Sequence, residues 1–247
     1  MVNKIIKVIS QKERYKFFSS NELNSLEYNY AIKIDSRSFL QIYISLIKQN
    51  HLIISTFFIK NDYNIFLLKI ALFLILFNLF SFINTLFFTE DSIHEIYEDE
   101  GEYNVIYQFP QILYSTLISQ IISFPLGKLS LTQDDFLGLK EKNNLNEITN
   151  EMKILKKRIK IKCIIFFIIG FILSVYFWYY LSAFCTVYYN TQFALIKDIL
   201  ISFTLSLINP FIFYLIPGFF RIIGLKYQIK CHYIFSNILI KIFEILS

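Results

Sequence analysis

Polar side chains recur at helical spacing within apolar stretches of this sequence, and their hydrogen-bonding chemistry requires partners in a buried setting. In lipid, such groups are expected to turn toward neighbouring helices, where each interhelical hydrogen bond contributes about 0.6 kcal/mol. The candidate intramembrane polar face comprises Asn78, Asn84, Gln111, Ser115, Ser119, Asp198, Ser202, Ser206 and Asn209. These residues are interpreted either as contacts that hold helices together or as the lining of a water-filled path.

Catalytic chemistry is not indicated, because the histidines are too dispersed to act together. His51 and His232 are expected on one side of a membrane and His94 on the other. The sequence contains no HExxH pair, nucleophile elbow, phosphate-binding loop or dinucleotide-binding motif. Its three cysteines are far apart and form no CxxC pair. We therefore predict no enzymatic activity, no cofactor, and no catalytic or metal-binding residues.

An acidic stretch between residues 89 and 104 could attract cations. It contains seven carboxylates and no Lys or Arg. The calcium loop of an EF-hand needs ligands at fixed alternate positions around a central Gly, and Glu98 to Glu102 do not supply that spacing. A solvated anionic surface is therefore the main interpretation, with weak cation binding as the alternative.

The segments that must position the polar residues are long and apolar. Hydrophobic residues make up 55% of the 247 residues and the mean hydropathy is +0.49, too apolar for one water-soluble core. A helix needs about 20 residues to cross the hydrocarbon core of a bilayer. We predict membrane spans at residues 65–88, 105–127, 163–187 and 196–219. Lys69, near the start of the first span, is expected to extend its ammonium group to the lipid headgroups.

The charges between the spans predict how the chain is oriented. Nine Lys or Arg occur in residues 1–64 and nine in residues 128–162, whereas the loop 89–104 has none. Because cationic loops stay on the cytoplasmic side, the acidic loop is expected outside and both termini in the cytoplasm. The predicted fold is an all-α membrane protein, with a bundle of about four transmembrane helices and interfacial and cytoplasmic helical extensions.

The extensions are expected on the cytoplasmic side. Residues 39–58 are interpreted as helices on the membrane face; a fifth crossing is the alternative, although it would place Lys48 near mid-bilayer at about 3 kcal/mol. The basic connector 128–162 is expected to run as a helix into the third span, and the tail 220–247 to be amphipathic. The candidate helix-packing seam in the connector comprises Leu145, Ile148, Met152, Leu155 and Ile159. The seam is expected to pack on the protein itself, on a partner or on a second subunit.

The four prolines lie in or beside the second and fourth spans. Pro125 and Pro217, each close to a glycine, are expected to stop their helices. Pro210 is expected to kink the fourth helix, because it frees a backbone carbonyl.

Several stretches resemble an uncharacterised family of protist multi-pass membrane regions, which often form the C-terminal ends of very large surface proteins. The stretches are Asp35–Phe39, Ile93–Gly101, Phe177–Cys185 and Asn190–Gln192, and the resemblance covers roughly residues 30–225. It implies a multi-pass membrane region and no particular activity.

A fainter similarity is to the membrane helices upstream of the pore domain in polycystin-1-like proteins. The residues that carry it are Phe124-Pro125 at the end of a span and Ser182-Ala183-Phe184 before a short outer turn. This sequence lacks the large extracellular domain and the pore helices of that family, so the similarity does not imply channel activity.

These observations predict a non-enzymatic multi-pass membrane anchor or assembly subunit. The alternative is a component of an ion channel or transporter, lined by the polar faces of the first, second and fourth spans. The expected partners are the lipid bilayer and, through the cytoplasmic helices, a protein partner or a second copy of the chain. Neither a nucleic acid nor a small-molecule substrate is expected.

Overall fold

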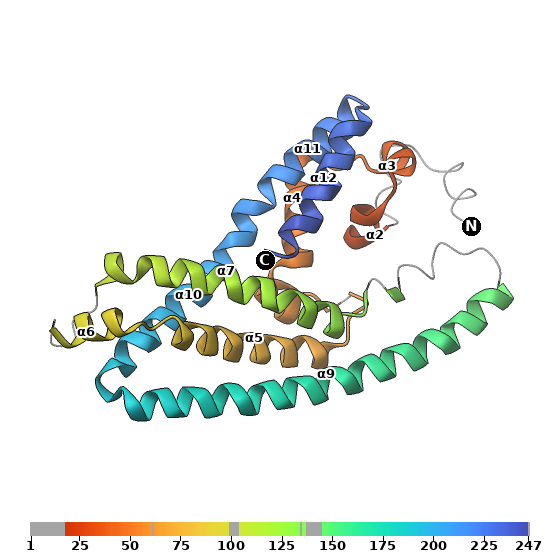
Figure 1. Cartoon of the computed structure of the whole chain (residues 1–247). Coiled ribbons are helices and arrows are strands. Elements are labelled where there is room, and N and C mark those ends of the chain that lie inside the picture. Colours follow the sequence, from red (N-terminus) through yellow and green to blue (C-terminus); the bar gives the residue numbers. More distant parts are fainter. Residues whose placement is uncertain (1–17, 61, 99–103, 134, 137–144, 247) are drawn as a thin grey trace.

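The computed structural model describes residues 18–60, 62–98, 104–133, 135–136 and 145–246 (Figure 1). Within these ranges, every regular element is a helix, which confirms the predicted all-α class. The elements are α2 (Ser20–Ser25), α3 (Tyr28–Ile34), α4 (Phe39–Asn50), the π-helix η2 (Ile54–Phe58), α5 (Phe66–Leu86), α6 (Glu90–Glu98), α7 (Val105–Ser130), α9 (Leu145–Val187), the 3-10 helix η3 (Tyr189–Thr191), α10 (Gln192–Phe213), α11 (Leu215–Lys226) and α12 (Lys230–Phe243).

Four helical segments are long and apolar enough to cross a membrane, as predicted, and they characterise the chain as an integral membrane protein. They are Phe66–Leu86, Ile106–Ser130, Asn150–Val187 and Tyr189–Lys226. Figure 1 shows α5 between α7 and α9, with α10 passing across them, and α5 contacts all three. Half of the apolar window of α5 is buried inside the protein, against 17% of that of α9. Thus α5 is the central helix, and α9 presents most of its apolar surface to the surroundings.

The packing around α5 follows from its sequence, in which apolar residues occur on every face of the helix. Leu68, Leu72 and Leu79 are buried in a core that also includes Phe166 and Phe177 of α9. A helix that is hydrophobic all round is expected at the centre of a membrane bundle, because no face of it needs water.

The predicted connector helix and the third span form one continuous helix, α9, of 43 residues. At about 1.5 Å per residue its length is about 65 Å, twice the hydrocarbon thickness of a bilayer. Its N-terminal part extends beyond the ends of the other spans (Figure 1). We call Asn150–Lys162, the described charged part of this extension, the α9 arm.

The candidate packing seam of the arm is not buried as a unit. Leu155 is buried and Ile159 is half-buried, whereas the Met152 side chain is 54% exposed. The side chains of Leu145 and Ile148 lie outside the described residues. The seam therefore offers exposed surface in at least part of its length.

The helices that flank the spans pack on each other more closely than predicted. The tail folds back as α12 along α11, and α4 packs on α11 as well (Figure 1). Ile42 and Leu46 of α4 are buried together with Tyr214, at the junction of α10 and α11. With 12 residues, α4 is about 18 Å long, too short for the fifth crossing considered above.

Lys69 does not extend to the headgroups; that expectation was wrong. Its side chain is 2% exposed. Its Nζ donates to the carbonyl oxygens of Ser55 at 2.8 Å and Ile59 at 2.7 Å, and pairs with Asp62 at 3.1 Å. Carbonyls at the end of a helix lack backbone partners, so the end of η2 together with a carboxylate replaces the solvation that the headgroups would have supplied.

The prolines do not stop the helices where predicted. Helix α7 continues past Pro125 to Ser130, and Pro217 lies in the first turn of α11, which runs on to Lys226. A proline in a first turn costs little, because its missing N–H would have had no intrahelical partner. The interruption in the fourth span comes at Tyr214, four residues after Pro210.

Candidate functional site

Three spans meet at a fully buried asparagine. The Asn84 amide of α5 donates to Ser202 Oγ of α10 at 2.7 Å, and its Oδ1 accepts from Ser115 Oγ of α7 at 2.9 Å. All three side chains belong to residues with 0% exposure. One asparagine therefore links the central helix to two neighbours. We call Asn84, Ser115, Ser202, Gln111 and Asp198 the intramembrane cluster.

The part of this cluster nearest α6 contains a carboxylate. Gln111 Nε2 donates to Asp198 Oδ2 at 2.9 Å, and Asp198 is 0% exposed. Ser92 of α6 donates to Gln111 Oε1 at 3.4 Å, so the acidic helix α6 also contacts the cluster. The hydrogen bonds of Gln111 thus join α6, α7 and α10.

Toward the other end of α7 the polar contacts become weaker. Asn209 Nδ2 donates to Gln120 Oε1 at 3.4 Å, and the Ser206 hydroxyl donates within its own helix to Phe203 O at 2.6 Å. Ser119 Oγ is buried and has no hydrogen-bond partner among the described residues. Asn78, also on the candidate face, is half-buried and has no hydrogen bond to the cluster within the described part of the chain.

The spacing of the sequence explains why these contacts form. Gln111 and Ser115 are one helical turn apart on α7, and Asp198 and Ser202 are one turn apart on α10. Because neither lipid nor the apolar side chains of the spans offer hydrogen bonds, the two polar faces satisfy each other and Asn84 between them. Seven of the nine candidate residues therefore take part in hydrogen bonds, and Asn78 and Ser119 do not within the described chain.

The Asn84–Ser202 bond can be measured with a double-mutant cycle. We expect Asn84→Ala and Ser202→Ala to show a coupling free energy of about 0.6–1.7 kcal/mol, the range for interhelical hydrogen bonds in membranes. Unfolding midpoints in mild detergent would provide the measurement. Asn78→Ala combined with Ser202→Ala is the matched control and should be additive. A cycle with no coupling for Asn84 would show that the bond contributes nothing to stability.

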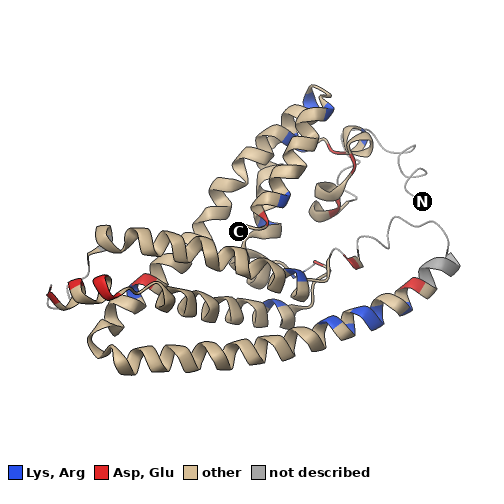
Figure 2. Cartoon of the chain, viewed as in Figure 1, with Lys and Arg blue, Asp and Glu red and all other residues tan. Residues whose placement is uncertain are grey.

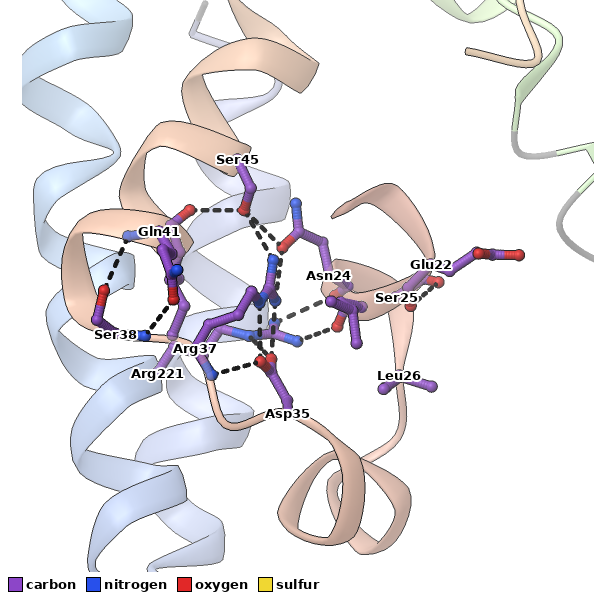
Figure 3. Close-up of polar contacts among 12 residues, drawn as sticks. Glu22, Asn24, Ser25, Leu26, Asp35, Arg37, Ser38, Gln41, Ser45 and Arg221 are labelled. Atoms are coloured by element: carbon purple, nitrogen blue, oxygen red, sulfur yellow. Dashed lines mark hydrogen bonds and ion pairs between the residues drawn. The ribbon is translucent and has the colours of Figure 1, made fainter. Parts of the chain in front are cut away.

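A second polar group, which the sequence interpretation missed, lies among the helices flanking the spans (Figure 3). Arg37 forms a two-pronged ion pair with Asp35, with Nε to Oδ1 and Nη2 to Oδ2 both at 2.7 Å. The two side chains are 4% and 0% exposed. Arg37 also donates to Ser45 Oγ of α4 at 3.0 Å. The pair therefore fixes the turn between α3 and α4.

Arg221 of α11 is the centre of this group and is itself fully buried. Its Nη2 donates to Leu23 O at 2.7 Å and to the Tyr233 hydroxyl at 2.8 Å. Its Nη1 donates to Asn24 O at 3.1 Å and to Asn237 Oδ1 at 3.2 Å. Arg221 therefore joins α11 and α12 to α2, which is almost 200 positions earlier in the chain.

Two further contacts, made by Asp35 and by the Tyr233 hydroxyl, also connect the N-terminal helices to α11 and α12. Arg221 Nε lies 3.8 Å from Asp35 Oδ2, so both arginines are paired with one carboxylate. The Tyr233 hydroxyl donates to Leu26 O at 2.6 Å. Burial raises the pKa of Tyr233, which keeps this hydroxyl protonated, while the Arg221 cation acts in the opposite direction. We call Asp35, Arg37, Arg221 and Tyr233 the Arg221 network.

One signal in the sequence could have indicated the Arg221 network. Arg221 is the only charged residue between Ile199 and Leu225, so an isolated charge interrupts a long apolar run. A charge in that setting normally has a buried partner.

The three histidines contact different elements of the structure. His51 packs edge-on against Phe211, His94 lies 3.3 Å from Glu98 on α6, and His232 lies beside Phe220. Among the described residues, no group of three His, Cys, Asp or Glu side chains is arranged to hold a metal ion. The two buried polar groups are thus the strongest candidates for function that the described chain offers. No protein-family model, curated protein or solved structure matches the chain.

Proposed function

We propose that the chain is a non-enzymatic multi-pass membrane anchor or assembly subunit. The observation that carries this proposal is the use of the polar side chains within the spans. Asn84, Ser115 and Ser202 are fully buried, and Asn84 hydrogen-bonds to both serines at the meeting point of α5, α7 and α10. Because these side chains form hydrogen bonds between helices, they support a role in holding the bundle together.

The distribution of charge supports an orientation for this anchor. Figure 2 shows acidic residues on α6 at one end of the spans and the Lys and Arg residues of the α9 arm at the other. Under the rule that cationic segments stay in the cytoplasm, α6 faces out and both termini face in. In sealed cells, an impermeant thiol reagent should label Glu95→Cys on α6 and leave Lys157→Cys on the arm unlabelled. The reverse pattern would overturn the orientation.

A partner or a second copy of the chain is proposed to bind the α9 arm. The arm extends past the other spans and exposes both apolar and charged side chains, including Met152 at 54% and Ile154 at 59%. Crosslinking through cysteines placed there should capture the partner, and Leu155→Asp, which disrupts the seam, should weaken the capture.

A channel or transporter component is the second candidate, and one observation favours it. Gln108 Oε1, Ser119 Oγ and Gln120 Nε2 are buried polar atoms of α7 without a hydrogen-bond partner in the described chain. Buried polar groups normally have partners, so water or an ion along this helix would satisfy them. These three polar atoms of α7 are consistent with a narrow polar path beside the intramembrane cluster.

A measurement of ion flux distinguishes the anchor proposal from the channel or transporter proposal. Purified protein in liposomes should give no selective cation flux above that of empty liposomes if the anchor proposal is correct. A cation current that Asn209→Leu or Ser119→Leu abolishes would contradict it and establish the polar path. The matched control is Phe193→Leu, a substitution of a side chain on α10 that is 65% exposed and outside the cluster.

A further inference from the structure

A cavity of about 340 Å³ lies at the end of the bundle where α5 begins and α7 ends. Its apolar lining includes Leu52, Leu72, Leu76 and Phe124, and its polar lining includes lysines, carboxylates and side-chain amides. The volume falls at the lower end of the range for small-molecule sites. The cavity is partly apolar and partly polar and lies at the end of the spans. It therefore fits an amphipathic molecule.

The amide side chains of this cavity offer donors. The Oε1 atoms of Gln49 and Gln133 accept hydrogen bonds from Asn24 at 2.9 Å and Asn21 at 2.6 Å. The remaining polar group of each side chain is its NH₂. Asn64 Oδ1, also at the cavity, already accepts from the backbone N–H groups of Thr132 and Gln133. The cavity therefore suits a ligand rich in acceptor oxygens.

The charged side chains at the cavity also favour a ligand rich in acceptor oxygens. Its carboxylates are already paired, with Asp135 at 2.8 Å from Lys162 and Glu244 at 3.7 Å from Lys128. The Lys128 pair is longer than a hydrogen bond, and the Lys128 side chain is 51% exposed. With half of the Lys128 side chain exposed, an anion at the mouth of the cavity can reach its ammonium group.

The α9 arm adds a cationic surface nearby. Lys153, Lys156, Lys157 and Lys160 are exposed and lie on one helical face at i, i+3, i+4 and i+7. Figure 2 shows the cations of the arm adjoining the end of the bundle. Lysines beside a span attract anionic lipid at about 1 kcal/mol each. We call these four residues the lysine stripe.

We propose that this cavity binds the phosphate-bearing headgroup of an anionic phospholipid. The Lys128 ammonium and the amide NH₂ groups of Gln49 and Gln133 donate to the phosphate oxygens, while the acyl chain lies against Leu72 and Leu76. The lysine stripe raises the local concentration of anionic lipid. This site does not depend on the anchor proposal, because both an anchor and a channel component would contain it.

Gly127 provides a direct test of the cavity. It lines the cavity, and a Cβ atom added to it would meet no other atom within 4 Å. Gly127→Leu should place its side chain in the cavity and weaken binding of dioctanoyl phosphatidylglycerol about tenfold or more. Tyr114→Leu, on the same helix and 58% exposed, is the matched control. Binding would be measured by native mass spectrometry of the full chain in mild detergent.

The charge contribution is tested in the same assay. Lys128→Gln should reduce the preference for dioctanoyl phosphatidylglycerol over dioctanoyl phosphatidylcholine, whereas Lys226→Gln, at the far end of α11, should not. Inorganic phosphate at the same concentration should displace little of the lipid, because it lacks the acyl chain.

Three results would overturn the proposal. The first is equal binding of the two lipids. The second is unchanged lipid binding by both Gly127→Leu and Lys128→Gln, with loss only when the four stripe lysines become glutamine, which would indicate surface attraction alone. The third is full displacement by inorganic phosphate, which would make the site one for free phosphate.

Discussion

Arg221→Met is expected to lower the free energy of unfolding by about 3–5 kcal/mol, the usual cost of removing one partner from a buried charged group. The substitution keeps a long apolar side chain but removes the donors to Leu23 O, Asn24 O and the Tyr233 hydroxyl. These acceptors are enclosed by α2 and α12, so water cannot replace the guanidinium without opening the structure. We therefore expect α2 and α3 to detach from the α11–α12 hairpin.

Two measurements would detect this loss. Thermal unfolding in mild detergent should show a lower midpoint, and backbone amides in α2 and α12 should exchange with deuterium faster. Lys226→Met is the matched control, because it removes an exposed cation from the same helix. Equal midpoints and equal exchange rates for the two variants would mean that the Arg221 network does not hold these elements together.

Gly224→Ala and Gly218→Ala are expected to change stability in opposite directions, although both glycines lie in α11. A Cβ atom at Gly224 would lie 2.8 Å from the backbone N of Tyr233, so α12 would have to move. Overpacking of this kind costs about 1–3 kcal/mol. A Cβ atom at Gly218 would meet its nearest neighbour, a Phe39 ring atom, at 3.5 Å, which is an ordinary contact. Alanine there should stabilise the helix by up to about 1 kcal/mol.

The same unfolding assay measures both variants. The two should differ by about 2 kcal/mol, with wild-type protein between them, if the overpacking cost exceeds the gain in helix propensity. Deuterium exchange in α12 should rise only in Gly224→Ala. Equal stabilisation of both variants would show that α12 does not pack closely on α11 at this position.

Both predictions concern α11, the C-terminal part of the fourth apolar segment, and the helices that pack on it. The Arg221 network ties α2 and α3 to the α11–α12 hairpin, and α11 continues the last span with only Tyr214 between them. A force or partner acting on residues 20–34 would thus be transmitted to the membrane-spanning helices through buried contacts. The intramembrane cluster provides the corresponding connection among α5, α7 and α10.

The helical class, the four spans and the charge asymmetry could be predicted from the sequence, because each depends on local composition. A run of apolar residues that matches the hydrocarbon thickness favours a membrane helix whatever its neighbours are. The continuity of α9 also follows from local sequence, since no proline occurs between Leu145 and Val187. The periodic polar faces of α7 and α10 indicated that these side chains would turn toward other helices.

The partners of each charged or polar group were decided only by the tertiary structure. Lys69 was expected to reach the headgroups, but the end of η2 and Asp62 surround it. Arg221 lies at the start of the tail 220–247, which was expected to be amphipathic and cytoplasmic, yet it is fully buried and bonded to a residue almost 200 positions away. Pairing of this kind depends on the geometry of several packed helices at once, and helical periodicity specifies only the face that a residue occupies. The sequence by itself therefore determined which segments enter the membrane, and the packing determined which side chains meet there.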